Sequence, residues 1–338
     1  MTLKDRLEAI LSSFPKQRIL VLGDLMLDKY WWGEAHRLSP EAPVPVLRKR
    51  KATVSPGGAA NTAANLTALG ATVNLIGAIG TDVAAEELCE ALRSTGIDTR
   101  HLLRCPERPT TSKTRIVALN QHVVRVDEED TTAIDTTQVE EVAHRADTVM
   151  GEVNALVISD YAKGLLTPPL LARAIGSAKR AGIPIFVDPK GSDWTRYKGA
   201  TLLKPNRAEL SLLTGLPIRS REDTVQAAMQ LLPLLEGTCL LVTEGEDGMT
   251  LFRHAQPAQH IPSVERHVYD VTGAGDTVLA TFAISVSSGA SYRDAMILAT
   301  HAAAVAVGSV GTTTVSAESL RGAIEMALLG RSASMADN

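Results

Sequence analysis

Short apolar runs alternate with helical patterns along most of this chain. Residues 18–23 (RILVLG) have the unbroken hydrophobicity of a strand buried on both faces, and residues 59–70 predict a helix of small residues that ends at Gly70. The alternation predicts further strands at 72–80, 155–160, 184–188, 201–206, 239–245 and 249–252, and helices at 82–96, at 168–182, from Asn206 onward and, as two or three segments, between Gly273 and Leu329. Strands separated by helices predict an α/β fold with a mostly parallel central sheet and helices on both faces.

Two segments, residues 28–56 and 110–127, interrupt this alternation. The first mixes three aromatic residues, Tyr30, Trp31 and Trp32, with prolines and a basic run, and the second has alternating β-branched residues with a turn predicted at Asn120–Gln121. Both predict added antiparallel strands, which together would form a small sheet standing off the main one as a lid over a substrate. A simple extension of the central sheet is the alternative.

Composition and charge narrow the class of protein. With 45% hydrophobic and 21% charged residues, the 338-residue chain can bury a large core, and we expect one domain over residues 1–330 and a polar, disordered tail at 331–338. A net charge of -4 gives no bulk attraction to nucleic acid or to an anionic membrane. No signal peptide or long apolar run is visible, so we expect a cytoplasmic protein. The cysteines, which suggest neither a disulfide framework nor a zinc site, are Cys89, Cys105 and Cys239.

The strongest chemical signal is the octapeptide DVTGAGDT at residues 270–277. A Gly-Ala-Gly turn that opens a helix exposes backbone N–H groups at the positive end of the helix dipole, which suits a phosphate. Asp276 lies in the first turn of that helix, where it could accept the proton of a hydroxyl group while these amides hold a transferring phosphoryl group. The alternative is that Asp276 only caps the helix.

Two further motifs accompany this octapeptide, PGGAANTAAN at residues 56–65 and KPNRAE at 204–209. All three, in this order, resemble the signatures of the ribokinase-like (pfkB) sugar kinases. The resemblance implies ATP-dependent phosphorylation of a sugar, with Asp276 as general base and an anion hole formed by the amides of Gly273, Ala274, Gly275 and Asp276. Taken singly, the second motif also fits tight helix packing, and the third fits a plain capping box.

The same resemblance implies the ligand contacts of other residues. Substrate-binding residues would be Asp28, Gly57, Gly58, Asn61, Asn65, Arg125 and Lys163. Nucleotide-binding residues would be Asp188, Lys190, Asn206, Glu209, Thr243, Gly245 and Gly248, with Asn206 and Glu209 ordering Mg²⁺ through water. Asp270 and Thr272 would bind a monovalent cation such as K⁺ if this member uses one. The turn at 243–248 could instead be an ordinary hairpin turn.

Four longer stretches, residues 23–46, 159–166, 187–206 and 268–278, are similar to one branch of the family, the D-glycero-β-D-manno-heptose 7-phosphate kinases. That likeness implies phosphorylation of the C1 hydroxyl to give the 1,7-bisphosphate, in ADP-heptose and lipopolysaccharide core synthesis. Another sugar or sugar-phosphate kinase of the family is the alternative. Cations that could bind the 7-phosphate are Arg37, Arg48, Lys51, Lys113, Arg115, Arg125, Lys163 and Lys190. No His-x-Gly-His motif occurs, so we expect the later adenylyl transfer to belong to another polypeptide.

Other readings are weaker. A dinucleotide-binding Gly-x-Gly-x-x-Gly loop fails because Val278 stands at the third glycine, and a sugar sensor without activity would not need both Asp276 and Glu209. The predicted lid has unpaired strand edges, which favours a homodimer formed through it, with a monomer as the alternative.

Overall fold

The computed structural model describes residues 2–118, 121–264, 270–308 and 311–336, with the backbone alone for 330–336. The strands of its main sheet are β1 (Arg18–Gly23), β4 (Thr72–Ile76), β9 (Ala155–Ser159), β10 (Ile185–Asp188), β11 (Leu202–Leu203), β12 (Cys239–Thr243), β13 (Met249–Phe252) and β14 (Gln259–Ile261). Their order is β14-β13-β12-β11-β10-β9-β1-β4. The strands from β12 to β4 run parallel, as the alternation of strands and helices predicts. Strand β13 pairs antiparallel with β12, and β14 pairs antiparallel with β13.

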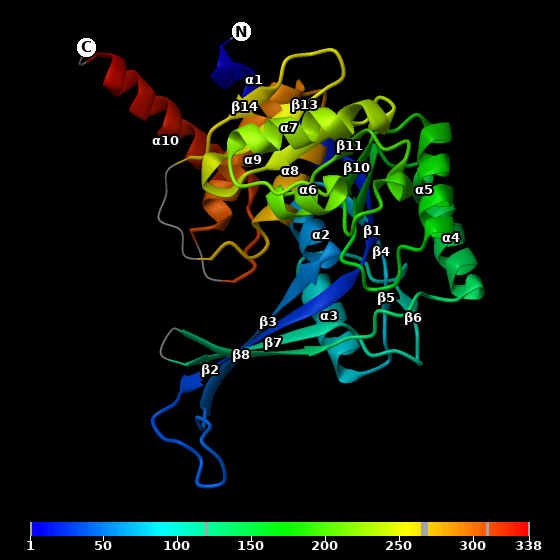
Figure 1. Cartoon of the computed structure of the whole chain (residues 1–338), viewed down its shortest axis with the longest axis vertical. Helices are drawn as coiled ribbons and strands as arrows, with labels where there is room; N and C mark the ends of the chain where they lie inside the picture. Colours follow the sequence, from blue (N-terminus) through cyan, green and yellow to red (C-terminus); the bar gives the residue numbers. More distant parts are fainter. Residues whose placement is uncertain (1, 119–120, 265–269, 309–310, 337–338) are drawn as a thin grey trace.

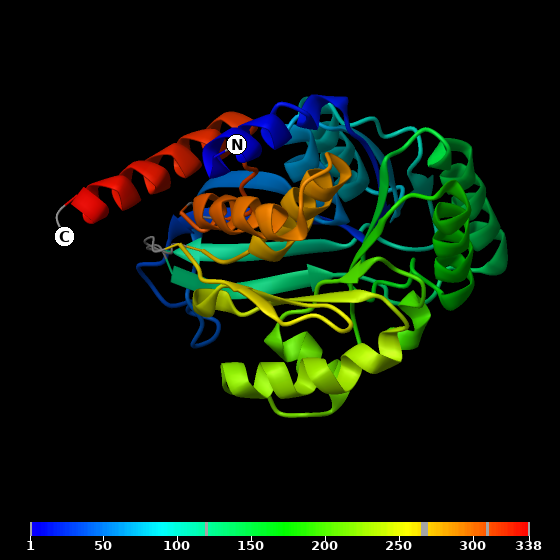
Figure 2. The same ribbon diagram turned by 90° about the horizontal axis from the view of Figure 1, so that it is seen from above.

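Helices cover both faces of this sheet (Figures 1 and 2). One layer contains α1 (Leu3–Leu11), α2 (Ala59–Ala68), α3 (Val83–Ser94), α8 (Ala274–Ser287), α9 (Tyr292–Ala306) and α10 (Ala317–Ala336). The opposite layer contains α4 (Thr136–Met150), α5 (Pro168–Ala181), α6 (Arg207–Thr214) and α7 (Arg221–Leu231). Short 3-10 turns are η1 (Phe14–Lys16), η2 (Trp194–Tyr197), η3 (Leu232–Leu235) and η4 (Gly245–Asp247).

Strand β1 shows why the central strands are apolar throughout. Ile19 and Val21 pack into the hydrophobic core on the α8 side of the sheet. Leu20 and Leu22 alternate with them and pack into the core on the α5 side. Because successive side chains of a strand point to opposite faces, a sheet with a core on each face needs apolar residues at every position.

Helix ends follow local signals in the sequence. Thr167 caps the first turn of α5, ahead of the proline that begins the helix, and Gly182 ends the helix in the left-handed conformation with φ of 70°. Asp82 likewise accepts a hydrogen bond from the amide of Ala85 at the start of α3. These boundaries confirm the predicted helices at 82–96 and 168–182.

The lid is a separate sheet made of β2 (Leu25–Glu34), β3 (Arg48–Gly58), β7 (Ser112–Ala118) and β8 (Gln121–Glu128). It projects from the main body (Figure 1), so the prediction of a sheet that stands off the main one is confirmed. Its strands are not all antiparallel as expected, since β2 and β7 pair in parallel. Both strands leave the body in the same direction, and each then pairs with an antiparallel neighbour, β3 or β8. The turn predicted at Asn120–Gln121 falls partly outside the described residues.

Other expectations need correction. The single strand expected at 72–80 is broken, because β4 ends at Ile76 and β5 (Ala78–Ile79) pairs instead with β6 (Leu103–Arg104). Helix α10 is described as far as Ala336 and projects past the body beside α1 (Figures 1 and 2), and the disordered tail expected at 331–338, part of which lies outside the described residues, stays a prediction. Among the described residues, no helix combines the length and the hydrophobicity that a membrane span requires.

Candidate functional site

Asp276 lies in the first turn of α8, as predicted. The residue that precedes the helix, Gly273, has φ of 80°, and a Cβ atom built on it would lie 2.7 Å from the side-chain nitrogen of Asn61. Glycine is therefore required there both by the backbone conformation and by the close approach of α2. Among the amides expected to form the anion hole, that of Ala274 donates to the carbonyl of Val271 at 3.2 Å. The anion hole itself stays a prediction.

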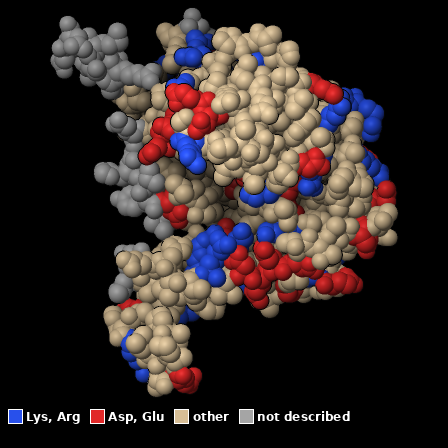
Figure 3. All heavy atoms as spheres, viewed as in Figure 1, with Lys and Arg blue, Asp and Glu red and all other residues tan. Residues whose placement is uncertain are grey.

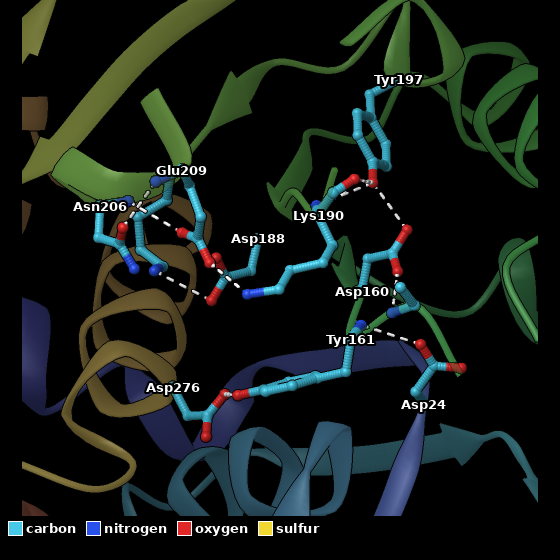
Figure 4. A network of polar contacts seen from close by, with 11 residues as sticks. Asp24, Asp160, Tyr161, Asp188, Lys190, Tyr197, Asn206, Glu209 and Asp276 are labelled. Carbon is cyan, nitrogen blue, oxygen red and sulfur yellow. Dashed lines mark hydrogen bonds and ion pairs between the residues drawn. The ribbon is translucent and has the colours of Figure 1, made fainter. Parts of the chain in front are cut away.

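The carboxylate of Asp276 is surrounded by hydrogen-bond donors from distant parts of the chain. Asn61 donates to Oδ2 at 2.8 Å, and Thr62 donates to Oδ1 at 3.1 Å. The hydroxyl of Tyr161 also donates to Oδ1, at 2.9 Å (Figure 4). Only 3% of Asp276 is exposed. Burial raises the pKa of Asp276 above its usual value, while these hydrogen bonds and the charge of Lys204 act in the opposite direction.

The two asparagines predicted to bind substrate have protein partners in this structure. Asn61 donates a hydrogen bond to the carboxylate of Asp276, as described above, so its side-chain nitrogen already has a protein partner. Asn65 is fully buried, and its side-chain oxygen accepts from the hydroxyl of Thr277 and from the amide of Val315. Asn65 thus joins α2 to α8 within the core. Neither arrangement tests a contact with a sugar.

Asp28 and the two glycines Gly57 and Gly58 form one close-packed group where the lid meets the body. Asp28 is buried on β2 and forms an ion pair with Arg115 of β7. A Cβ atom on Gly57 would lie 2.4 Å from Oδ2 of Asp28, and one on Gly58 would lie 2.6 Å from the carbonyl oxygen of Asp24. These glycines therefore allow the backbone to approach the two aspartates.

Basic side chains gather on the lid beside the hollow that separates it from the body (Figure 3). Lys163 pairs with Glu129 at 2.7 Å, and Arg125 pairs with Asp127 at 2.8 Å. Lys113 of β7 lies opposite Asp127 of β8, on the same face of the lid as Arg125. Burial first, and then the charges of Lys163 and Arg125, lower the pKa of Lys113. Lys113, Arg125 and Lys163, a group we call the cationic cluster, come from two lid strands and from the loop after β9.

The residues predicted to contact nucleotide and Mg²⁺ meet at the ends of β10 and β11 (Figure 4). Asn206 and Glu209 form a capping box, with hydrogen bonds of 2.9 and 3.0 Å, which confirms the structural interpretation of that motif and leaves the magnesium role a prediction. Glu209 also accepts from Nζ of Lys190 at 3.0 Å.

Behind these residues lies a buried ion pair, in which Nζ of Lys204 is 3.0 Å from Oδ2 of Asp188. Burial raises the pKa of Asp188, and the positive charge of Lys204 opposes that rise. Lys204 also faces the turn that begins α8, since a Cβ atom on Gly275 would lie 3.5 Å from its Nζ.

The remaining residues predicted to bind ligands, Asp270 with Thr272 and the segment 243–248, lie in hydrogen-bonded turns. Asp270 accepts from the amide and hydroxyl of Thr272 and from the amide of Gly311. Burial alone would raise the pKa of Asp270, but these hydrogen bonds hold it below its usual value. Residues 243–248 join the antiparallel strands β12 and β13 through η4, with Gly245 and Gly248 at positive φ, so this segment is a hairpin turn. Whether Thr243 contacts a nucleotide stays untested.

Sequence reasoning gave no role to Tyr161 and Lys204, although both follow strands of the main sheet. Ligands of parallel sheets bind at the carboxyl ends of strands, so position alone marks these residues as candidates. Among the described residues there is no group of three or more His, Cys, Asp and Glu side chains that could hold a metal ion, and the three cysteines are free.

Comparison with known proteins assigns the fold and relates the motifs to a family. A family model described as pfkB family carbohydrate kinase matches residues 16–319. The chain is 46% identical over 297 residues to the bifunctional protein HldE of Geobacter metallireducens, covering 88% of this chain and 61% of that protein. The corresponding protein of Shewanella amazonensis is 44% identical over 310 residues, covering 92% of this chain and 64% of the relative. The chain therefore spans less than two thirds of the length of these relatives.

Solved structures with the same fold are more distant in sequence. Arabidopsis thaliana ribokinase, complexed with ribose and ATP, has a TM-score of 0.72 at 22% identity, covering 91% of this chain and 98% of that one. The tetrameric inhibited form of phosphofructokinase-2 from Escherichia coli has a TM-score of 0.71 at 19% identity, covering 86% and 94% of the two chains. The expected ribokinase-like fold is confirmed.

Proposed function

This chain is a carbohydrate kinase of the pfkB family, and from that premise we propose that it phosphorylates the C1 hydroxyl of D-glycero-β-D-manno-heptose 7-phosphate. The phosphoryl donor is ATP, and the product is the 1,7-bisphosphate of ADP-heptose and lipopolysaccharide core synthesis. The observation that carries the proposal is the buried Asp276 at the start of α8, held by donors from α2 and from the loop after β9. The identity to the two HldE proteins directs the choice of sugar.

In the proposed reaction Asp276 accepts the proton of the C1 hydroxyl. The C1 oxygen then bonds to the γ-phosphorus, the bond from that phosphorus to the bridging oxygen breaks, and ADP leaves. Burial supports this role, because a pKa raised above the usual carboxyl value makes Asp276 a stronger base. Because Asp276 lies in the first turn of α8, the amides at the start of that helix would lie near the transferring phosphoryl group and would stabilise its charge.

The cationic cluster supports a substrate that already carries a phosphate. Lys113 and Arg125 lie on paired strands of the lid, and Lys163 lies on the loop after β9, so an anion between them would gain charge-assisted hydrogen bonds from the lid and from the body. The carboxylates now paired with Arg125 and Lys163 are Asp127 and Glu129. A phosphate would compete with these carboxylates for the same cations.

Magnesium would neutralise charge on the nucleotide phosphates. Asn206 and Glu209 fit a hydrated ion better than a direct ligand site, because their side-chain oxygens already accept the capping-box hydrogen bonds. Lys190, bound to Glu209, lies where it could exchange that carboxylate for a phosphate oxygen. A monovalent cation is also part of the proposal. Its ligands would be the carboxylate of Asp270 and the backbone carbonyl of Thr272.

We propose that the enzyme works in the cytoplasm as a homodimer formed through the lid. The outer strand β8 is exposed along its length, with about half of each of Val124 and Val126 accessible, and it has a free edge. Trp31 is exposed on the lid, whereas Tyr30 and Trp32 stack on each other, with Tyr30 buried. Light scattering at micromolar concentration tests the dimer, and a mass near the 35.9 kDa of one chain would contradict it.

A substrate panel tests the activity. Purified protein with MgATP is offered the heptose 7-phosphate, fructose 6-phosphate, ribose and adenosine, and ADP release is measured. We expect the highest kcat/KM with the heptose phosphate and a new anomeric phosphate in the ³¹P spectrum. A preference for fructose 6-phosphate or ribose would replace the proposed sugar but keep the kinase, and phosphorylation at another carbon would overturn the C1 assignment.

A further inference from the structure

Tyr161 reaches the candidate base from a loop that belongs to another part of the sheet. The loop follows β9 and lies beside the turn that begins α8 (Figure 4). The Tyr161 hydroxyl donates to Oδ1 of Asp276 at 2.9 Å, although the two residues are 115 positions apart. Burial raises the pKa of Tyr161 well above its usual value, and the negative charge of Asp276 adds to the rise. The hydroxyl therefore stays protonated and remains a donor around neutral pH.

Two buried carboxylates fix the backbone of this loop. Asp24 accepts from the amides of Tyr161, Lys163 and Leu165, at distances between 2.9 and 3.3 Å. Asp160 accepts from the amide of Ala162 at 2.7 Å and from the hydroxyl of Tyr197 at 2.7 Å. Five hydrogen bonds to these two buried carboxyl groups hold a stretch of a few residues, so the direction of the Tyr161 side chain is set before any substrate binds.

The backbone of the loop after β9 is also held in uncommon conformations. Ala162 has φ of 54°, a left-handed conformation that alanine adopts rarely. Gly164 has φ of 86°, and a Cβ atom there would lie 2.1 Å from the carbonyl oxygen of Thr132. Strained backbone of this kind persists where surrounding contacts enforce it, and it occurs most often at functional sites.

A count of acceptor positions on Asp276 distinguishes its two oxygens. A carboxylate oxygen offers two lone pairs, and those of Oδ1 are used by Tyr161 and Thr62. Oδ2 accepts a single hydrogen bond from a described side chain, that of Asn61, and keeps one lone pair. We propose that Tyr161 is a positioning residue, which occupies Oδ1 together with Thr62 and so leaves Oδ2 as the oxygen that takes the proton of the sugar hydroxyl.

This inference rests on the proposed function, since it names the atom at which the acceptor hydroxyl binds. When the sugar O–H bond breaks, the proton bonds to Oδ2, and the freed oxygen attacks the γ-phosphorus. Fixing the carboxylate through Oδ1 holds Oδ2 in the direction of attack, and alignment of reacting groups is a large part of catalysis by positioning.

The charged groups around Asp276 set how it titrates. Lys204 on the β11 side holds the pKa of Asp276 down, as do the hydrogen bonds from Asn61, Tyr161 and Thr62, whereas burial raises it. The acidic neighbours Asp188, at the end of β10, and Glu209, on α6, also lie in this electrostatic environment. Removing the Tyr161 hydroxyl takes away one of the contributions that lower the pKa, so the pKa of Asp276 must rise.

Tyr161→Phe is the first test, because phenylalanine keeps the ring and removes only the donor. We expect kcat to fall roughly 10- to 100-fold, the range for loss of a hydrogen bond to a charged group, with little change in KM for ATP. A general base works when deprotonated, so activity is lost as the pH falls through its pKa. The acid limb of the kcat profile should therefore move to higher pH. A variant with unchanged kcat and an unchanged acid limb overturns the proposal.

Tyr197→Phe is the matched control. It also removes a buried tyrosine hydroxyl that donates to a carboxylate of this loop, Asp160, without touching Asp276. We expect it to lower stability and to leave the acid limb in place. An equal shift of the acid limb in both variants means that any loosening of the loop suffices, which overturns a specific role for Tyr161.

Two measurements address the mechanism directly. If Tyr161 acts only through Asp276, then Tyr161→Phe made in an Asp276→Asn background should cause no further loss of rate, and a further loss of full size contradicts the proposal. A crystal structure with the sugar phosphate and a non-hydrolysable ATP analogue should place the acceptor hydroxyl at Oδ2. A hydroxyl that has replaced Tyr161 at Oδ1 overturns the assignment of the oxygen.

A titration without turnover separates this inference from the choice of sugar. The ¹³C resonance of the Asp276 carboxyl, assigned by comparison with Asp276→Asn, should have its midpoint at higher pH in Tyr161→Phe than in the wild type. If the heptose phosphate is not a substrate, the proposed sugar fails, and this titration still decides whether Tyr161 controls Asp276. An identical midpoint in the two proteins overturns the inference whatever the substrate is.

Discussion

The start of α8 and the lid both carry predicted site residues, but they are built in different ways. At α8 the carboxylate of Asp276 is almost fully buried, and its partners Asn61 and Tyr161 are distant in sequence. On the lid, Arg125 is exposed and pairs with Asp127, two residues away on the same strand. Tertiary structure therefore fixes the surroundings of Asp276, as it fixes the buried pair of Asp28 and Arg115 at the base of the lid, whereas the outer lid strand carries exposed charges that a bound phosphate would recruit.

This difference between the two regions indicates which interactions are already formed before substrate binds. Buried hydrogen bonds to a charged group are strong and geometrically fixed, so the body is preorganised. Exposed ion pairs contribute little to stability and are screened by salt, so breaking them for a phosphate costs little. Substitutions in the body should then change kcat, and substitutions in the lid should change KM.

The largest effect is expected for Asp276→Asn. Asparagine keeps the size of the side chain but cannot accept the proton, so kcat should fall by roughly 10²–10⁴, the usual contribution of a general base. Binding of sugar and nucleotide, measured by calorimetry, should stay within a few fold. Near-normal turnover would assign the base to another residue and remove the contrast with the lid.

Gly57→Ala tests the junction between the two regions. The added Cβ atom would lie 2.4 Å from Oδ2 of Asp28, so the backbone or the carboxylate must move. We expect a loss of about 1–3 kcal/mol in the free energy of unfolding, typical of overpacking, and a higher KM for the sugar. Gly151→Ala is the control, because nothing lies within 4 Å of a Cβ atom there. Equal stability of the two variants in urea titrations would contradict the close approach.

Arg125→Ala tests the lid alone. It should raise KM for the sugar phosphate roughly 10-fold through loss of a charge-assisted hydrogen bond, while kcat changes little. High salt should reduce the difference from wild type. Arg100→Ala is a matched control, since Arg100 is an exposed arginine that also pairs with an aspartate two residues away, Asp98. A large fall in kcat for Arg125→Ala would mean that the lid shares in the chemistry.

The smallest effect is expected for Glu209→Gln. Glutamine can still accept the capping-box hydrogen bond from the amide of Asn206, so α6 should begin at the same place. Loss of the negative charge should raise the Mg²⁺ concentration needed for half-maximal rate, because a carboxylate orders the ion and its waters better than an amide. Glu236→Gln, which removes an exposed pair with Lys198, serves as control. An unchanged magnesium titration would count against the metal role of Glu209.

Much of the fold follows from local features of the sequence. Unbroken apolar runs predicted β1 and β9, and the prolines and glycine around 168–182 predicted α5 with its boundaries. The motif around Asp276 predicted both the helix start and the candidate base. Such features are local, because periodicity and capping depend on residues within one or two turns.

Contacts between distant segments could not be predicted in this way. Periodicity does not reveal that Tyr161 meets Asp276, or that Asn65 joins α2 to Thr277 of α8. The parallel pairing of β2 and β7 depends on how both strands leave the body, and no short-range signal encodes that direction. The sequence pattern predicted no helix where the structure has α4. That helix begins with a capping box at Asp135, but the alternation of strands and helices gave no reason to expect it.

The glycine pair at the end of β3 has a consequence for how the enzyme uses ATP. Gly58, with φ of 59°, ends the lid strand, and Asn61, which donates to the candidate base Asp276, follows three residues later on α2. A displacement of β3 would therefore be transmitted to the residue that holds the Asp276 carboxylate. Since that carboxylate is already aligned without a ligand, we expect a lid that moves out of place to slow phosphoryl transfer from ATP, even when sugar and nucleotide are both bound.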